Sequence, residues 1–363
     1  MLTKEEQEIY NRHLQLDEVG LEGQLKLKSS KVLVIGAGGL GCPVLQYLSA
    51  AGVGEIGVVD FDTVDKSNLH RQILYSYNSQ GKKKVEESKR RLEENNPFNS
   101  IQTYSERITT ENAMDLIGAY DIVVDCSDNY DTRYLVNDCC VTLDKPMVYA
   151  AIYKFEGQVS VFNYKGGPTY RCLHPESPNS DSQENCSDTG VLGILPGIIG
   201  SFQANEVLKL ILEIGEPLSG VLFQYSALTN RLDKFKFTRK EHEIYDQIRR
   251  GELNPDNYGV SCGLDEIQEI TDDEFREACA GGVQLIDVRN LDELPRLDHL
   301  NALRIPLLEL ESRVEEIDKT KSTVVFCQSG KRSKIAIQTL MKTDRFERLI
   351  NLKNGVGSLE FAN

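Results

Sequence analysis

The sequence predicts an α/β fold: a domain with a doubly wound parallel sheet, followed by a second, small α/β domain. Unbroken apolar runs such as KVLVIG (31–36) are typical of parallel strands buried on both faces. Helical patterns separate the first several of these runs, as they do in doubly wound sheets. The length of 363 residues is too long for one ordinary core and favours two domains.

The expected elements follow in a regular order along the first domain. The run 31–36 leads through a glycine-rich turn into a helical stretch at 43–51. Further strand-like runs lie at 55–62, 121–126, 146–152 and 158–163. Residues 165–190 lose periodicity and fill with Gly, Pro, Ser, Asn and Asp, which predicts a long crossover loop. A helix and two strands complete the domain, at about 196–214, 220–226 and 231–237.

These patterns predict three parts of the chain. The first domain spans 1–238, and the charged, irregular stretch 239–265 is expected to be a linker. The second domain spans 266–363. Its expected strands lie at 283–288, 302–305, 322–327 and 348–352.

Composition and charge exclude several classes of protein. The net charge of −15 argues against direct binding of nucleic acid, because phosphate contacts need clustered Lys and Arg. No apolar run approaches the ~20 residues that a membrane-spanning helix needs. The polar N-terminus is unlike a secretory signal, and nine scattered cysteines are unlike a disulfide framework. We therefore expect a cytoplasmic protein without a membrane partner, in which most cysteines are core residues.

A glycine-rich segment, GAGGLG, lies between the first strand and the first helix. Its glycines are Gly36, Gly38, Gly39 and Gly41, and they allow backbone N–H groups to approach phosphate oxygens at a helix N-terminus. Asp60 ends the next strand, where a carboxylate can accept hydrogen bonds from ribose hydroxyls. These features predict a nucleotide site, and alone they fit a nicotinamide-dependent dehydrogenase as well as an ATP-using enzyme.

Charged residues further along the chain favour a triphosphate. Arg71 and Lys84 follow the second strand, and Asp128 and Asn129 follow the strand that ends at Cys126. Two cations and a carboxylate suit ATP with Mg²⁺, because Mg²⁺ prefers one or two carboxylates plus phosphate oxygens. The cations would also stabilise charge that moves during attack at the α-phosphate.

Four separated segments carry the most specific signal. They are GAGGLGCPV, VVDFDTVDKSNLHRQ, the pair Asp128-Asn129 and GVLGILPGIIGSFQANEVLKLI. Together they resemble the MoeB/ThiF family of adenylating enzymes, which is related to the ubiquitin-activating enzymes. The resemblance implies a Rossmann-like adenylation domain that uses ATP, with Asp128 as the Mg²⁺ ligand. It assigns the nucleotide contacts to Gly39, Asp60, Ser67, Asn68, Arg71 and Lys84.

The segment YNRHLQL (10–16) resembles the N-terminal motif of the same family, in which an arginine reaches the phosphates of the other subunit. This resemblance implies a homodimer with Arg12 as that arginine. The implied reaction converts a carboxylate, which is a poor acyl donor, into an acyl-adenylate. That step needs positioning and charge neutralisation and no protein nucleophile.

Two cysteines are candidates for catalysis. Cys186 lies in the irregular loop before GVLG, where family members with a fused rhodanese domain carry a cysteine. From there it could form an acyl thioester or a disulfide. Cys327 follows a buried strand and precedes a helix, so the loop after it can act as an anion nest that favours a thiolate or persulfide. This persulfide loop comprises Cys327, Gln328, Ser329, Gly330, Lys331 and Arg332.

The segment STVVFCQSGKRS resembles the active-site loop of rhodanese, which implies a persulfide on Cys327. Three flanking segments also resemble rhodanese motifs: DVR (287–289), DHL (298–300) and RIPL (304–307). Four residues separate Cys327 from Arg332, whereas tyrosine-phosphatase-like relatives have five. The shorter spacing favours sulfur over phosphate as the group that the loop holds.

One part of the family pattern is missing. The family usually holds a structural zinc ion with two CxxC pairs, but here the first pair is reduced to Thr169 through Cys172 and the second to Cys262. Tetrahedral zinc needs four good ligands, and His174 would add only a third. We therefore predict that structural zinc is absent.

The function expected from the whole chain is activation of a small ubiquitin-like sulfur-carrier protein ending in Gly-Gly, followed by its loading with sulfur. The implied sulfur donor is an enzyme such as a cysteine desulfurase. Molybdopterin, thiamine, tRNA-thiolation and cysteine or siderophore-type pathways all use this chemistry in the family, and the sequence does not select one of them. The alternatives are a dehydrogenase and a non-catalytic scaffold that binds a carrier; five retained residues argue against the scaffold, namely Arg71, Lys84, Asp128, Cys186 and Cys327.

Overall fold

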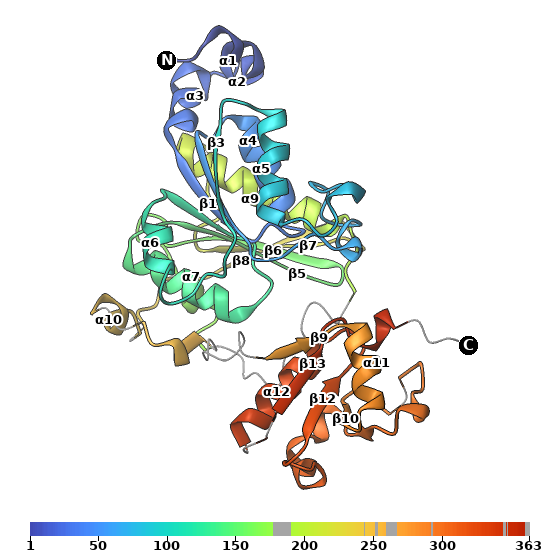
Figure 1. Ribbon diagram of the computed structural model, residues 1–363. Helices are drawn as coiled ribbons and strands as arrows, with labels where there is room; N and C mark the ends of the chain where they lie inside the picture. Colours follow the sequence, from blue (N-terminus) through green and yellow to red (C-terminus); the bar gives the residue numbers. More distant parts are fainter. Residues whose placement is uncertain are drawn as a thin grey trace. The chain divides into compact units, whose positions relative to one another are not determined.

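Two compact units make up the chain, Met1–Val260 and Ser261–Asn363 (Figure 1). The computed structural model describes residues 1–176, 190–242, 244–250, 253–258, 267–291, 293–343, 346 and 348–359. Both units combine helices with a largely or wholly parallel sheet, so the predicted fold class is confirmed. The domain limits at 238 and 266 stay predictions.

The first unit is built on an eight-stranded sheet in the order β3-β2-β1-β4-β5-β6-β7-β8. The first five strands in this order run parallel, and the last three extend the sheet as antiparallel strands. The order reverses between β1 and β4, and ligands of open α/β sheets bind at such a switch point, beyond the carboxyl ends of the strands. The strands are β1 (Lys31–Ile35), β2 (Glu55–Val59), β3 (Ser100–Tyr104), β4 (Ile122–Asp125), β5 (Met147–Tyr153), β6 (Glu156–Phe162), β7 (Val221–Ser226) and β8 (Arg231–Lys236).

Side chains on β1 alternate between two cores, one on each face of the sheet. Val32 and Val34 belong to the core beneath α3, α4, α5 and α9, whereas Leu33 and Ile35 belong to the core beneath α6 and α7. All four side chains are buried, as expected for a strand covered on both faces. Figure 1 shows the two helical layers. The helices are α1 (Lys4–Ile9), α2 (Asn11–Leu14), α3 (Gly20–Ser29), α4 (Gly41–Ala51), α5 (Lys84–Asn95), α6 (Ala113–Gly118), α7 (Tyr130–Thr142), α8 (Tyr170–Leu173), α9 (Leu195–Leu212) and α10 (Ile244–Arg249).

Sequence analysis missed the edge strand β3 and the N-terminal helices. β3 reads SIQTY, and the exposed Ser100 and Gln102 hide the apolar signal of a strand. The start of α1 carries a recognisable signal: Glu6 N donates to Thr3 Oγ1 (3.1 Å), and Thr3 N donates to Glu6 Oε2 (2.7 Å). This reciprocal capping box could have been found from the spacing T-x-x-E.

Part of the stretch that was expected to be a linker folds onto the first unit. α10 lies within 239–265, and its Tyr245 and Ile248 are buried against Val141 of α7. A 3₁₀ helix, η4 (Pro255–Tyr258), follows, and the Tyr258 hydroxyl donates to Asp138 Oδ2 (3.1 Å). The linker was predicted from the charged composition of this stretch, which does not reveal the few apolar residues that pack against α7.

The second unit has a five-stranded parallel sheet in the order β11-β10-β12-β13-β9. Sequence analysis missed β9, which is only three residues long. Neighbouring residues of β12 again serve opposite cores, with Val325 in one and Phe326 in the other. Along the described parts of both units, no helix is long and apolar enough to cross a membrane. The elements are β9 (Gln268–Ile270), α11 (Asp272–Ala280), β10 (Gln284–Asp287), β11 (Leu303–Arg304), β12 (Ser322–Phe326), α12 (Lys331–Thr343) and β13 (Arg348–Leu352).

Glu87 on α5 ties the helix to the segment that precedes it. Its buried carboxylate accepts hydrogen bonds from Ser79 Oγ (2.7 Å) and Arg90 Nη2 (2.9 Å), and Lys82 Nζ lies 3.3 Å away. The bond from Arg90, with those from Ser79 and Lys82, lowers the pKa of Glu87 from 4.5 to about 2 against the opposing effect of burial. A carboxyl with a lowered pKa stabilises the fold above its unfolded-state pKa, and this stability is lost as the pH falls through the folded-state value.

We expect Glu87→Gln to lower the free energy of unfolding by about 1–2 kcal/mol near neutral pH, because a charge-assisted network is lost. The difference from the unsubstituted protein should shrink as the pH falls from 4.5 to about 2, where the carboxyl itself becomes protonated. Urea denaturation across this pH range measures the effect. A difference that stays constant with pH would contradict the assignment.

Candidate nucleotide and persulfide sites

The glycine-rich loop connects β1 to α4 in a conformation that requires glycine at two positions. Gly36 has a φ of +96°, and a Cβ placed there would lie 2.7 Å from the carbonyl oxygen of Cys126. A Cβ on Gly41 would lie 2.0 Å from the carbonyl oxygen of Gly36. This close approach of the loop backbone brings the N-terminus of α4 to the carboxyl end of β1, at the switch point of the sheet.

The backbone of Ala37 anchors this loop from two sides. Its N–H donates to Asp60 Oδ2 (2.8 Å), and its carbonyl accepts a hydrogen bond from the Tyr75 hydroxyl (2.7 Å). Asp60 Oδ1 also accepts from the N–H of Asp62 (2.8 Å). The predicted ribose ligand therefore lies directly beside the loop and also holds the loop in shape.

Lys84 supplies a buried positive charge next to these carboxylates. Its Nζ donates to Asp62 Oδ2 (2.8 Å), and its side chain is only 6% exposed. Burial raises the pKa of Asp60, and the nearby Lys84 ammonium opposes that shift. Lys84 and Asp60, 24 positions apart in the sequence, thus belong to one charged cluster at the end of β2.

Arg71 lies against the other side of the loop. Its Cγ would lie 3.7 Å from a Cβ on Gly39, and its Nη1 donates to the carbonyl of Ser67 (3.1 Å). Ser67 and Asn68 form the short helix η1 (Lys66–Asn68), where Asn68 Oδ1 accepts from the N–H of Asp65 (3.2 Å). The described residues therefore bring Arg71 to the glycine loop, and nucleotide contacts by Ser67 and Asn68 stay a prediction.

Gln72 is a candidate that sequence analysis missed. It is 4% exposed, and its Nε2 would lie 3.7 Å from a Cβ on Gly38. Its Oε1 is buried without a hydrogen-bond partner among the described residues. A buried amide oxygen that lacks a partner is costly. Gln72 is therefore a candidate to accept a hydrogen bond from a donor group of the nucleotide. Its position directly after Arg71 was the available signal.

Asp128 and Asn129 follow β4 on the same edge of the sheet. Both side chains are exposed. Asn129 is the N-cap of α7, where its Oδ1 accepts a hydrogen bond from the N–H of Thr132 (2.8 Å). The cap gives Asn129 a structural role, whereas the exposed carboxylate of Asp128 is accessible to a metal ion.

A buried ion pair, which sequence analysis missed, fixes the turn that carries Asp128. Arg133 Nε donates to Asp125 Oδ2 (3.2 Å), and Arg133 Nη2 donates to the carbonyl of Ser127 (3.0 Å). The Ser127 hydroxyl donates to Asp125 Oδ1 (2.6 Å). Because the partners of this network are buried and mutually satisfied, the turn after β4 is held in one conformation.

Arg12 lies in the short helix α2, away from the glycine loop in sequence. Its side chain is exposed, and its Nη1 lies 3.5 Å from Gln15 Oε1. The predicted reach of Arg12 to another subunit stays a prediction.

Cys327 lies at the end of β12 and is fully buried. The Ser333 hydroxyl lies 3.5 Å from Cys327 Sγ and 2.6 Å from Asn351 Oδ1. On the other side, the N–H of Val356 donates to the carbonyl of Cys327 (2.8 Å). The contact with Ser333 places the sulfur atom beside the N-terminal end of α12.

The rest of the persulfide loop is held by partners from neighbouring segments. Gly330 has a φ of +82°, in the left-handed region that favours glycine. Arg289 Nη1 donates to Gln328 Oε1 (3.4 Å), and Arg332 forms an ion pair with Glu293. Ser329 N would lie 2.5 Å from a Cβ on Gly355, so the loop packs closely against the backbone after β13.

Most of the described cysteines are core residues, as predicted. Cys42, Cys126, Cys139 and Cys140 are buried. Burial raises the pKa of Cys42 and of Cys139 to about 12, which keeps these thiols protonated and unreactive at neutral pH. Cys186 and Cys262, the loop cysteine and the remnant of the second CxxC pair, lie outside the described residues.

The remnant of the first CxxC pair takes part in a hydrogen-bonded cluster. Cys172 Sγ accepts from the N–H groups of Thr169 (3.3 Å) and Lys240 (3.1 Å). The neighbouring Arg171 donates to both carboxylate oxygens of Asp138 (2.7 and 2.6 Å). Burial lowers the pKa of His174, the third candidate ligand, and this favours its neutral form. The absence of structural zinc stays a prediction.

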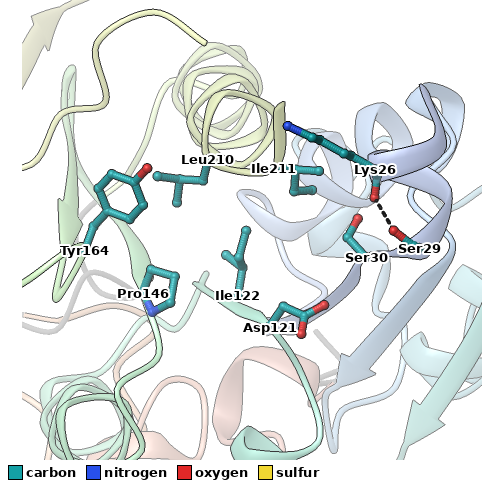
Figure 2. A pocket seen from close by; sticks show the side chains of 9 residues that line it. All are labelled: Lys26, Ser29, Ser30, Asp121, Ile122, Pro146, Tyr164, Leu210 and Ile211. Carbon is teal, nitrogen blue, oxygen red and sulfur yellow. Dashed lines mark hydrogen bonds between the residues drawn. The ribbon is translucent and has the colours of Figure 1, made fainter. Parts of the chain in front are cut away.

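A separate cavity of about 340 Å³ lies at the opposite end of the sheet. Ser30 precedes β1, Ile122 begins β4 and Pro146 precedes β5, so these lining residues mark the amino ends of the strands. Tyr164 and Leu210 complete its apolar wall (Figure 2). The predicted nucleotide residues lie at the carboxyl ends, and this cavity is therefore a different site.

The ThiF family matches residues 10–245, and a rhodanese-like domain matches residues 271–360. The chain belongs to the ThiF family. The resemblance seen in the sequence motifs is confirmed for both parts. The family match leaves the dehydrogenase alternative without support.

Relatives named as adenylyltransferases align with most of the chain, and one of them is also named a sulfurtransferase. The adenylyltransferase and sulfurtransferase MOCS3 of Xenopus laevis is 39% identical, over 96% of this chain and 84% of its own length. The probable molybdopterin-synthase adenylyltransferase of Porphyra purpurea is 37% identical over 98% and 93%. The sulfur carrier protein adenylyltransferase of Thermus thermophilus is 49% identical over 72% and 98%.

Solved structures agree on the fold of the first part. The structure of Escherichia coli MccB with ATP matches with a TM-score of 0.57 and 24% identity, over 64% of this chain and 72% of that chain. The structure of PaaA matches with a TM-score of 0.56 and 22% identity, over 66% and 76%. At these identities the likeness supports the fold alone.

The geometry of the loop predicts that alanine lowers stability unequally at two of its glycines, Gly41 and Gly38. Gly41→Ala should lower the free energy of unfolding by about 2–4 kcal/mol, because its Cβ would collide with the Gly36 carbonyl. Gly38→Ala should cost less than about 1 kcal/mol, since the nearest atom would lie 3.7 Å from the new Cβ. Thermal or urea denaturation of both variants checks this, and equal losses of stability would count against the loop geometry.

Proposed function

We propose that this chain activates the C-terminal glycine of a small ubiquitin-like sulfur-carrier protein with ATP, and that a persulfide on Cys327 then supplies sulfur to form a thiocarboxylate. The observation that carries this proposal is the joining of a ThiF region and a rhodanese-like region in one chain. Relatives named for adenylyltransferase and sulfurtransferase activity share both regions over most of their length.

The first step is adenylation of the carrier. An oxygen of the carrier's C-terminal carboxylate attacks the α-phosphorus of ATP, the bond to the β-phosphate breaks, and pyrophosphate leaves. The glycine loop offers backbone N–H groups, while Arg71 and Lys84 flank it with positive charge. Fixed charges of this kind stabilise the negative charge that builds up on the phosphates during attack.

The residues at this edge of the sheet fit a nucleotide with its metal ion. Gln72 and Arg71 lie beside Gly38 and Gly39 of the glycine loop, and the buried Oε1 of Gln72 lacks a partner among the described residues. Asp128 offers an exposed carboxylate to Mg²⁺. Bound there, Mg²⁺ would neutralise charge on the phosphate oxygens.

The second step is sulfur transfer. The terminal sulfur of the Cys327 persulfide attacks the acyl-adenylate, and AMP leaves, which gives an acyl disulfide. A thiolate then attacks the Cys327 sulfur, the carrier leaves as a thiocarboxylate, and a disulfide forms. In one route Cys186 supplies that thiolate. In the other, Cys186 first displaces AMP to form a thioester, the Cys327 persulfide then displaces Cys186 from the acyl group, and the freed Cys186 thiolate attacks the Cys327 sulfur. In either route a thiol reductant then reduces the disulfide and resets the enzyme.

Partners and assembly complete the proposal. The carrier ends in Gly-Gly, and a cysteine desulfurase is the proposed sulfur donor. The enzyme acts as a cytoplasmic homodimer in which Arg12 of one subunit reaches the nucleotide of the other. The exposed position of Arg12 supports such a role.

Asp128→Ala should abolish carrier-dependent exchange of pyrophosphate into ATP, because the metal ion loses its protein ligand. Asp115→Ala is the matched control, since Asp115 is an exposed carboxylate on α6. Exchange of radiolabelled pyrophosphate measures the reaction. Normal exchange by the Asp128 variant would refute the metal assignment. If the unsubstituted enzyme adenylates no carrier that ends in Gly-Gly, the proposed first step is wrong.

Cys327→Ala should separate the two steps. It should retain carrier adenylation and lose thiocarboxylate formation by at least about 100-fold, since the proposed persulfide forms on Cys327. Cys279→Ala is the control, because Cys279 lies in the same unit outside the loop. Intact mass of the carrier reports both products. Thiocarboxylate formed at an undiminished rate by the Cys327 variant would sink the second step.

A further inference from the structure

The arginine of the persulfide loop is already occupied by a carboxylate. Arg332 Nη1 donates to Glu293 Oε1 (2.5 Å), and Arg332 Nη2 donates to Glu293 Oε2 (2.7 Å). Both side chains are 25% exposed. Two parallel bonds between a guanidinium and a carboxylate are the strongest and most directional form of such a pair.

Glu293 is itself held in place beside the loop. The N–H of Asn290 donates to Glu293 Oε1 (2.9 Å). The bonds to Arg332 lower the pKa of Glu293 despite its partial burial, so the carboxylate stays charged at neutral pH. The segment that carries Glu293 follows β10, which pairs with β12 in parallel, so this segment and Cys327 leave the sheet at the same edge.

A second contact ties this segment to the loop. Arg289 is 2% exposed and bonds to both carboxylate oxygens of Asp287 (3.0 and 2.8 Å), while its Nη1 donates to Gln328 Oε1 (3.4 Å). The segment from Arg289 to Glu293 therefore contacts the loop at both Gln328 and Arg332. Glu293 therefore pairs with the arginine that ends the loop after Cys327, the cation of this loop for which an anionic sulfur donor would compete.

We propose that Glu293 sets the class of sulfur donor: by occupying Arg332 it disfavours small dianionic donors such as thiosulfate and leaves a loop suited to persulfides carried on a protein cysteine. This inference rests on the proposed function, because it assumes that Cys327 accepts sulfur. Glu293 is a positioning residue, since it acts through Arg332 and has no role in bond making.

Both kinds of donor use the same displacement at Cys327. The Cys327 thiolate attacks the outer sulfur of the donor, a new sulfur–sulfur bond forms, and the donor's own sulfur–sulfur bond breaks. Sulfite leaves with the electron pair when the donor is thiosulfate, and a cysteine thiolate leaves when the donor is a protein persulfide. Only thiosulfate brings two negative charges to the loop, and it therefore suffers most from the neighbouring Glu293 carboxylate.

The test uses the full chain and two variants, Glu293→Gln and Glu293→Ala. Glu316→Gln is the matched control, because Glu316 forms a similar two-bond pair with Arg313 (2.6 and 2.8 Å) on the surface of the same unit. The two donors are thiosulfate, assayed with cyanide as acceptor, and a cysteine desulfurase charged with L-cysteine. Steady-state kinetics gives KM and kcat for thiosulfate, and intact mass gives the persulfide on Cys327.

Loss of the Glu293 carboxylate should lower the KM for thiosulfate and raise kcat/KM by about 10-fold or more in both Glu293 variants, because the donor no longer competes with a carboxylate for Arg332. Glu316→Gln should leave both unchanged, and loading from the desulfurase should change less than about 3-fold. Unchanged thiosulfate kinetics in both Glu293 variants, with normal loading from the desulfurase, would overturn this inference and leave the proposed function standing. A Cys327 that accepts sulfur from neither donor in the unsubstituted chain would overturn both.

Discussion

The first unit depends on how the backbone of Ala37 is held. Asp60 accepts its N–H and Tyr75 donates to its carbonyl, so the end of β2 and the segment before α5 are both fastened to the loop after β1. These two bonds hold the loop in one conformation without any contact to a nucleotide. Binding then costs little ordering of the backbone, which is the advantage of a preorganised phosphate site.

The same arrangement explains why charges from distant parts of the sequence act together. Lys84 begins α5, and its ammonium is buried beside the carboxylates at the end of β2. A buried ammonium is stable only with close negative partners, so Asp62 and Asp60 keep it there. In the proposed function the phosphates of ATP would share this cation, since folding has already brought the loop and the charge together.

The sequence was a good guide wherever the physical constraint is local. Gly36 and Gly41 announce a turn that no other residue can make, and the apolar run of β1 needs burial on both faces. The buried pair of Asp125 and Arg133 was not visible in this way, because either residue alone looks like an ordinary surface charge. Their burial is decided by tertiary packing, which periodicity does not record.

In the second unit, too, a local motif could be predicted from the sequence and a distant partner could not. The spacing from Cys327 to Arg332 was enough to indicate the kind of loop, since the loop is one short segment. Glu293 lies 39 positions before Arg332, and only the parallel pairing of β10 with β12 brings them to one edge. Partners of this kind become evident once the order of strands in the sheet is known.

The docking of α10 has a consequence for how the chain can be divided. Tyr245 and Ile248 cover Val141, and the Tyr258 hydroxyl satisfies Asp138, the buried acid that also pairs with Arg171. A fragment that stopped after β8 would expose this apolar surface to water and remove a partner from a buried charge. The smallest autonomous piece therefore extends some twenty residues past the last strand of its sheet, to Tyr258.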